Sequence, residues 1–161
     1  VYGGFGTSLR FYGVDFSIGF TYQLGGQVLD QGYMFYMNSP AGTSTGNNYH
    51  HDLLNSWTPE NSGSNIPRFA YNDSNQAAVS DRFLTSASYL NIQNITLGYT
   101  LPKRITRKFL VENLRIYLAC DNVWYWSKRQ GLDPRQAING ITNPYYYAPI
   151  RTFSGGVTVT F

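Results

Sequence analysis

The sequence predicts an all-β chain whose strands form part of the wall of a transmembrane β-barrel. Three observations support this fold class. Apolar and polar residues alternate in five separate runs, short and long connections follow one another between these runs, and aromatic residues concentrate at the ends of the runs. No stretch approaches the roughly 18 uninterrupted apolar residues of a membrane-spanning helix, which excludes a helical membrane protein.

Composition supports a folded chain with turns. Of 161 residues, 42% are hydrophobic, 17% aromatic and only 13% charged, and the chain has sixteen glycines and seven prolines. This composition is unlike that of a disordered segment. Because Cys120 is the single cysteine, no intramolecular disulfide can form, and no spaced Cys/His metal pattern exists. We therefore expect no metal and no cofactor.

The first two strands are expected at residues 3–12 and 14–24. In the second, Val14, Phe16 and Ile18 begin an apolar set that alternates with small polar residues up to Leu24. Such a period of two is typical of a strand with one apolar face. Gly13 lies between the runs, where a tight hairpin turn favours glycine.

The other three strands are expected at residues 89–101, 114–126 and 152–161. In the first of these the apolar set changes phase at Gln93 and Asn94, which indicates a β-bulge. Pro102 ends that strand, because proline cannot donate to the ladder. The last strand runs to Phe161, the final residue of the sequence.

The connections are very unequal in length. The turn at Gly13 is minimal, and residues 103–113 allow a turn with one helical loop, whereas residues 25–88 and 127–151 form long connections. Outer-membrane barrels have short periplasmic turns at one rim and long extracellular loops at the other. We therefore expect the two long connections to be extracellular.

The alternation assigns each strand residue to one of two faces. The set expected to face lipid comprises Phe16, Ile18, Phe20, Leu97, Leu118, Val157 and Val159, and the set expected to face the lumen comprises Ser17, Thr21, Thr96, Thr100, Thr158 and Thr160. Aromatic girdles are expected from Tyr2, Phe11, Tyr12 and Phe161 at the short-turn side, and from Tyr22, Tyr89, Trp124, Tyr125 and Trp126 at the loop side.

Period two alone does not distinguish lipid from a protein core. The alternative is a soluble carbohydrate-binding β-sandwich, in which the aromatic residues would form a sugar platform. Five strands cannot close a sheet around their own core, and no expected helix covers the apolar face. No spaced carboxylate pair and no Ser/His/Asp set can be named either, so we do not expect an enzyme.

Several segments together carry a family resemblance. They are Gly3–Leu9, Phe20–Gly26, Trp57–Asn61 with Ile66–Arg68, Tyr89–Pro102, Leu114–Tyr117 with Asp121 and Asn122, and Arg151–Phe161. In this order, over nearly the whole chain, they resemble the C-terminal part of SusC/RagA-type TonB-dependent outer-membrane transporters. Residues 34–56 and 136–149 follow no pattern of that family, and there we expect variation with the substrate.

The resemblance implies a function and partners. Residues 1–161 would be the last five strands of a barrel of the 22-stranded type in the outer membrane of a Gram-negative bacterium, with the plug domain upstream. The remaining strands of the same barrel and membrane lipid would surround them. A SusD-like surface lipoprotein would cap the extracellular mouth, TonB would act through the N-terminal part, and the cargo would be an oligosaccharide or a peptide. The substrate, the particular lipoprotein and the oligomeric state stay open.

Three groups of residues and Phe161 are candidates for a role. Candidates for contact with the substrate or with the lipoprotein lid are Tyr145, Tyr146 and Tyr147, because aromatic faces stack on sugar rings and peptide side chains. The residues expected to face the lumen are Arg115, Tyr117 and Asp121, with a structural ion pair favoured for Asp121.

A basic turn is formed by Lys103, Arg104, Arg107 and Lys108, and it suits anionic lipid headgroups or solvent rather than nucleic acid. The resemblance implies that the assembly machinery reads Phe161. His50, His51 and Asp52 are interpreted as a solvated loop, because adjacent side chains on an extended backbone point apart.

Overall fold

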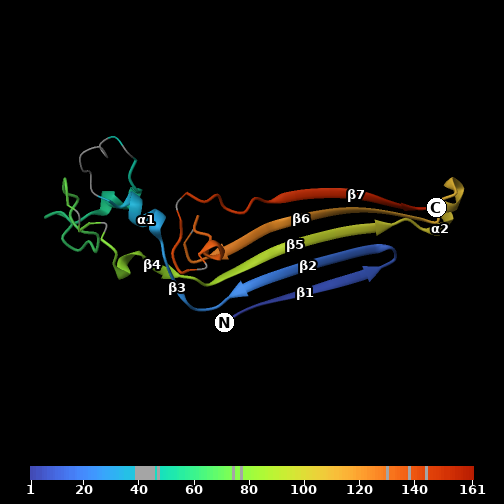
Figure 1. Ribbon diagram of the computed structural model, residues 1–161, viewed down its shortest axis with the longest axis horizontal. Coiled ribbons are helices and arrows are strands. Elements are labelled where there is room, and N and C mark those ends of the chain that lie inside the picture. Colours follow the sequence, from blue (N-terminus) through green and yellow to red (C-terminus); the bar gives the residue numbers. More distant parts are fainter. Residues whose placement is uncertain are drawn as a thin grey trace. The chain divides into compact units, whose positions relative to one another are not determined.

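The computed structural model describes residues 1–38, 46, 48–73, 75–76, 78–129, 131–137, 139–143 and 145–161. Five long strands form one antiparallel sheet in the order β1 (Tyr2–Phe11), β2 (Val14–Gln23), β5 (Tyr89–Thr100), β6 (Asn113–Ser127) and β7 (Thr152–Thr160) (Figure 1). The predicted all-β, antiparallel architecture is confirmed. Each strand begins and ends within one residue of the range expected from the alternation.

Chain contacts divide the described residues into two compact units. The first contains the long sheet and comprises Val1–Gly26, Ser86–Gly131 and Tyr147–Phe161. The second comprises Gln27–Thr85 and Leu132–Tyr146, which are the larger parts of the two long connections. No helix among the described residues combines the length and the apolar character needed to cross a bilayer.

A two-residue turn joins β1 to β2. Tyr12 and Gly13 have φ angles of 46° and 86°, and Phe11 pairs with Val14 on either side of them. Two successive residues with positive φ give the turn a backbone twist that matches the right-handed twist of the flanking strands. The backbone N–H of Thr100 donates to the carbonyl of Gly13 at 2.7 Å, which ties the turn to the end of β5.

A bulge near the middle of the sheet produces the phase change seen in the sequence. The register shifts between Gly19 and Phe20 in the β2–β5 pair, and between Ile92 and Asn94 in the β5–β6 pair. Gln93 is the extra residue of β5 relative to β2. Ile92 and Ile95 therefore lie on the same face although they are three positions apart.

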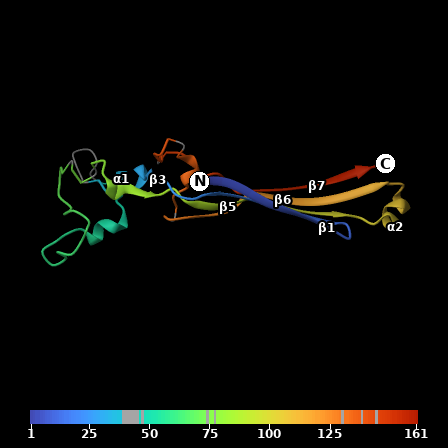
Figure 2. The same cartoon turned by 90° about the horizontal axis from the view of Figure 1, so that it is seen from below.

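The strand register separates an apolar face from a polar face. Phe16 pairs with Leu97, Leu97 pairs with Leu118, and Leu118 pairs with Gly155. The apolar side chains stay uncovered: Leu118 is 66% exposed and Val157 is 60% exposed. Figure 2 shows the long strands as one twisted layer. The Phe and Val side chains are thus not packed in a protein core.

One residue of the expected girdles lies at the opposite end of the sheet. Tyr2 pairs with Gln23, next to the long connection, so its placement at the short-turn side was wrong. The reason is the direction of β1, which runs toward the Tyr12–Gly13 turn and therefore starts at the other end. The placements of Phe11 and Tyr12 agree with the structure.

The short connection between β5 and β6 is helical, as expected. It contains α2 (Lys103–Thr106) and the 3-10 helix η4 (Arg107–Phe109). Figure 1 shows this connection at the same end of the sheet as the end of β7. Thr160 pairs with Asn113, which agrees with that view.

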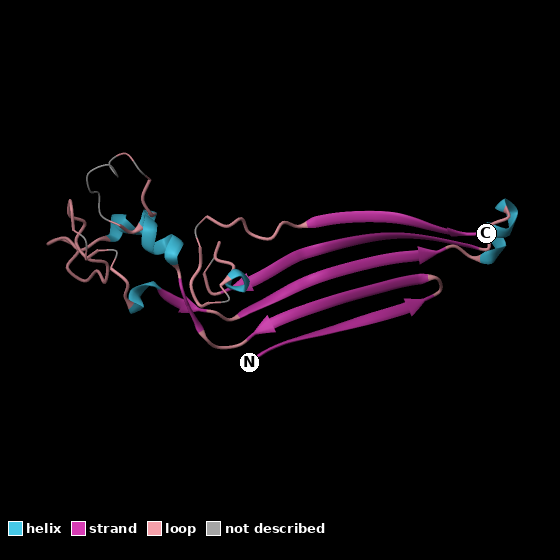
Figure 3. Ribbon diagram, viewed as in Figure 1, coloured by secondary structure: helices cyan, strands magenta, loops and turns pink. Residues whose placement is uncertain are grey.

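The long connections contain short elements that the sequence analysis did not identify. They are β3 (Gln27–Leu29), α1 (Gln31–Tyr36), η2 (His51–Asn55), η3 (Asp81–Phe83), β4 (Leu84–Ser86) and η5 (Pro134–Gln136) (Figure 3). Val28, Met37 and Phe83 are buried and form the apolar centre of this unit. Elements of three to six residues are too short to display a hydrophobic period, which is why they were missed.

Candidate functional site

The polar face of the sheet contains an ion pair that crosses one strand. Arg115 on β6 donates through Nε to Oδ1 of Asp15 on β2 at 2.9 Å, and its Nη2 contacts Oδ2. Both residues flank β5, which lies between their strands. The bidentate geometry satisfies both charges within the sheet. Arg115, a predicted lumen residue, therefore has a structural partner.

Two glycines make room for this arrangement. A Cβ on Gly98 would lie 2.5 Å from the carboxylate oxygens of Asp15 and 2.6 Å from Nη2 of Arg115. A Cβ on Gly156 would lie 2.7 Å from the ring of Tyr117. The guanidinium of Arg115 in turn lies 5.2 Å from the centre of that ring, within the range of a cation–π contact. Tyr117 therefore lies flat across β7 and contacts Arg115.

Asp121 lies on the same polar face, opposite Asn94. Its side chain is exposed, and no ion pair of Asp121 is found among the residues that the structure describes. The register thus brings Arg115, Tyr117 and Asp121 to one face, but joins only the first two. That this face lines a lumen stays a prediction.

In the second unit, hydrogen bonds join parts of the two long connections. Leu29 and Ile141 form a parallel bridge, in which Leu29 N–H donates to Gly140 O at 2.8 Å and Thr142 N–H donates to Leu29 O at 3.0 Å. The buried hydroxyl of Thr142 also accepts from Gln31 N–H at 3.0 Å and donates to Leu29 O at 3.2 Å. Residues more than a hundred positions apart are thereby held together.

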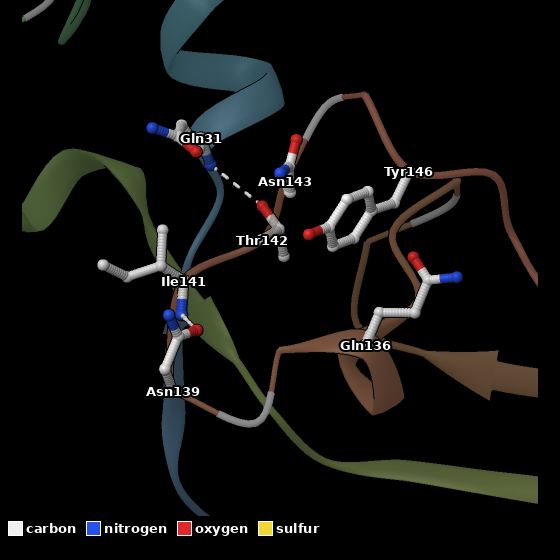
Figure 4. Close-up of a pocket in the computed structure, with 7 residues that line it drawn as sticks. All are labelled: Gln31, Gln136, Asn139, Ile141, Thr142, Asn143 and Tyr146. Atoms are coloured by element: carbon white, nitrogen blue, oxygen red, sulfur yellow. Dashed lines mark hydrogen bonds between the residues drawn. The ribbon is translucent and has the colours of Figure 1, made fainter.

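A pocket of about 320 Å³ opens beside this bridge (Figure 4). Its described lining comprises Gln31, Gln136, Asn139, Ile141, Thr142, Asn143 and Tyr146. These side chains are all uncharged at neutral pH. The amides supply both hydrogen-bond donors and acceptors, and Tyr146 supplies an aromatic face and a hydroxyl. Such a lining suits neutral hydroxyl or peptide groups.

The three consecutive tyrosines have different positions. Tyr146 lines the pocket, and Figure 4 shows its ring reaching toward Thr142. Tyr145 and Tyr147 are exposed and lie outside the pocket lining just described. The three were expected to act as one group, because local sequence cannot separate neighbours in an irregular loop. The amide residues of the pocket were not predicted, although Asn and Gln in residues 136–143 are a usable signal.

The charged residues that come just before Gln31 and Gln136 of the pocket lining in the sequence have partners of their own. Asp133 accepts from the backbone N–H of Arg135 at 3.1 Å and from its Nε at 2.8 Å, so these two side chains neutralise each other. Asp30 caps α1 by accepting from Tyr33 N–H at 2.9 Å. The pocket therefore keeps its uncharged character.

The histidine pair is arranged differently from the expectation. His51 begins the 3-10 helix η2, and both imidazoles turn toward Asp52: Nδ1 of His50 lies 3.5 Å and Nδ1 of His51 lies 3.3 Å from its carboxylate. The expectation that these side chains point apart was wrong, because the backbone does not stay extended: it turns into the 3-10 helix directly after the extended His50. Among the described residues no group of three potential metal ligands is close enough to hold an ion.

The carboxylate of Asp52 also joins two elements. It accepts from the hydroxyl of Tyr33 on α1 at 2.8 Å. This hydrogen bond is the largest influence that lowers the pKa of Asp52 below its ordinary value of 3.8, with attraction to both histidines adding to it and burial opposing it. The cluster thus fastens η2 to α1.

The last two predicted sites lie at the short-turn end of the sheet. Phe161 follows the end of β7 and is exposed. The four basic residues of α2 and η4 are exposed as well. A role of Phe161 in barrel assembly stays a prediction.

The comparisons with known proteins agree on one kind of relative. No protein-family model matches the chain. The TonB-dependent receptors P3 and P26 of Formosa agariphila are 26% and 27% identical to it across 98% of its length, and the chain spans 16% of each receptor. The TonB-dependent receptor SusC of Bacteroides thetaiotaomicron is 36% identical over 84 residues, which are 52% of this chain and 8% of SusC.

Solved structures show the same relationship. The RagAB peptide transporter matches with a TM-score of 0.82 and 25% identity, and the open-open state of the RagAB peptide importer matches with a TM-score of 0.81 and 25% identity. Each match covers 99% of this chain and 17% of the other. The resemblance to SusC/RagA-type TonB-dependent receptors is thereby confirmed, and these relatives are receptors and transporters rather than enzymes.

Proposed function

We propose that this chain forms part of the barrel wall and extracellular loops of a TonB-dependent transporter in the outer membrane of a Gram-negative bacterium. The transporter imports an oligosaccharide or a peptide, under a SusD-like lipoprotein and with energy delivered through TonB. The main support for this proposal is the sheet, which has one polar face and one uncovered apolar face. The fold matches the RagAB transporter with a TM-score of 0.82 over 99% of the chain.

The two faces of the sheet supply different environments in this proposal. The apolar face contacts lipid, where uncovered Leu, Val and Phe side chains are favourable. The polar face borders the barrel interior, and the Asp15–Arg115 pair stiffens it. Arg115, Tyr117 and Asp121 are then part of the lumen wall, and the engaged Arg115 and Tyr117 act in structure rather than in substrate binding.

The pocket of the second unit is proposed as a contact site for substrate on the extracellular side. Its uncharged amides and hydroxyl groups can exchange hydrogen bonds with sugar hydroxyls or with a peptide backbone, and Tyr146 can stack on a ring. The exposed Tyr145 and Tyr147 are proposed to contact the SusD-like lipoprotein, which acts as the lid. Phe161 is proposed as the residue read during assembly, so its deletion should lower outer-membrane abundance.

Uptake by the full-length transporter in its own host tests this assignment. Tyr146→Ala should weaken uptake by about 1–3 kcal/mol of binding, roughly 5- to 150-fold, because an aromatic anchor is lost. Outer-membrane abundance should stay unchanged, since the variant removes no strand contact. Trials with neutral oligosaccharides and with peptides identify which cargo is affected.

Tyr145→Ala is the matched control for this experiment. It removes the same side chain one position away, at a site outside the described pocket lining. Substrate affinity, measured on the transporter without its lipoprotein, should fall only in Tyr146→Ala, and equal losses of affinity in both variants would contradict substrate binding by the pocket. If growth on every oligosaccharide and peptide tested is independent of the transporter, the import function itself is contradicted.

A further inference from the structure

The helical turn between β5 and β6 is held firmly at the end of the sheet. Leu101 N–H donates to Leu114 O at 2.8 Å, and Glu112 N–H donates to Thr160 O at 2.8 Å. Thr106, in the middle of the turn, is only 2% exposed, and its carbonyl accepts from Val111 N–H at 3.3 Å. The body of the turn is therefore fixed, and the side chains around Thr106 point outward.

Four of these outward side chains are cationic. Lys103 and Arg107, and likewise Arg104 and Lys108, are four positions apart, so each pair shares one side of the helical segment. All four are exposed, and within the described part of the chain none of them forms an ion pair. The whole chain has a formal net charge of +3, so this turn supplies its positive balance.

Large apolar side chains project from the same turn. Phe109 is 72% exposed and Leu110 is 88% exposed, and Ile105 lies four positions before Phe109. Leu110 also has φ 59° and ψ 28°, a left-handed conformation that is strained for a residue with a side chain. A glycine would satisfy this C-cap without strain. The chain instead keeps a strained, exposed leucine next to an exposed phenylalanine.

We propose that this turn binds the headgroups of anionic glycerophospholipids in the membrane leaflet at the short-turn end of the barrel. The cations attract the lipid phosphates, while Ile105, Phe109 and Leu110 enter the boundary between headgroups and acyl chains. This inference rests on the proposed function, which places the ends of the spanning strands at a membrane surface. A soluble polyanion would account for the cations but not for the exposed Phe109 and Leu110.

Lipid titration of the full-length transporter in detergent tests the site. Native mass spectrometry measures the dissociation constants of phosphatidylglycerol and phosphatidylethanolamine. The double variant Arg107→Gln with Lys108→Gln should weaken phosphatidylglycerol binding by roughly 5- to 30-fold, since each basic group near an anionic surface contributes to the attraction. Phosphatidylethanolamine binding should change little, and the difference should shrink at about 1 M salt.

A matched double variant controls for the change in charge. Arg68→Gln with Lys128→Gln removes two exposed cations outside the turn and should leave phosphatidylglycerol binding as it is. Equal weakening by both double variants would overturn the site. So would displacement of phosphatidylglycerol by inorganic phosphate, which would indicate an anion site without a lipid component.

Leu110→Gly separates lipid contact from damage to the turn. Glycine relieves the left-handed strain, so the turn should keep or gain hydrogen-exchange protection while lipid affinity falls by a factor of about 3 to 10. Unchanged lipid affinity would overturn the role of the apolar side chains. Outer-membrane abundance and uptake, measured in parallel, report on the proposed function. Normal uptake together with equal affinity for phosphatidylglycerol and phosphatidylethanolamine refutes only the lipid site.

Discussion

At the scale of single residues, Gly13 is the position where backbone conformation decides the outcome of a substitution. Its φ of 86° lies in the left-handed region, and an added Cβ would lie 2.6 Å from the carbonyl oxygen of Thr100. That oxygen is backbone and cannot rotate away. Both the strain and the crowding therefore oppose any side chain there.

We predict that Gly13→Ala destabilises the β1–β2 hairpin by about 1–3 kcal/mol. Hydrogen exchange of the full-length protein should show faster exchange across both strands. Gly63→Ala is the control, because nothing lies within 4 Å of its added Cβ. Undiminished protection of the hairpin in the Gly13 variant would contradict the conformation described for the turn.

At the scale of elements, the contact between α1 and η2 depends on one ionised carboxylate. Because the pKa of Asp52 is lower in the folded unit than its ordinary value of 3.8, ionisation stabilises the contact. This stabilisation is present above the ordinary pKa and is lost as the pH falls through the lower, folded value. Protonated Asp52 no longer attracts the two histidines or accepts equally well from Tyr33.

We predict that the peptide covering residues 48–56 loses hydrogen-exchange protection, after correction for intrinsic rates, only below a pH of about 4. Tyr33→Phe removes the hydroxyl that lowers the pKa most, so protection should be weaker at neutral pH and should fall less as the pH drops. Tyr36→Phe, on the same helix, serves as the control. A profile that is identical in wild type and Tyr33→Phe would refute the role of this hydrogen bond.

At the scale of the whole molecule, the long sheet has two open edges. β1 and β7 each pair on one side only, and the apolar face has no cover among the described residues. In the proposed barrel each edge pairs with a further strand, because an unpaired backbone group in lipid costs several kcal/mol. In water, such edges and such a face favour aggregation.

We predict that residues 1–161 expressed alone aggregate or require detergent, while the full-length protein from the same host purifies in detergent as the folded barrel proposed above. Size-exclusion chromatography with light scattering, together with circular dichroism, measures both. A closed, monomeric and water-soluble fold of residues 1–161 would contradict the barrel and favour the sandwich. The full-length protein controls for losses during expression.

Much of the sheet followed from local pattern. Because side chains alternate between two faces, the sequence predicted all five strands, and the phase change at Gln93 predicted the bulge. The assignment of Arg115, Tyr117 and Asp121 to one face needed only this period. The placement of Tyr2 was wrong because alternation gives the face of a side chain, whereas the direction of β1 gives the end of the sheet at which Tyr2 lies.

The sequence by itself therefore determined the strands, their two faces and the unequal connections, since these depend on neighbours in the chain. Tertiary structure alone decided which distant groups meet. Arg115 reaches Asp15 across β5, and the Thr142 hydroxyl holds Gln31, 111 positions away, beside Tyr146 in the pocket. Such pairs depend on strand register and on how the loops close. The local alternation of apolar and polar residues contains no information about either. The histidines turned toward Asp52 for the same reason: a short helical turn, fastened by Tyr33 of another element, replaced the extended backbone expected from sequence.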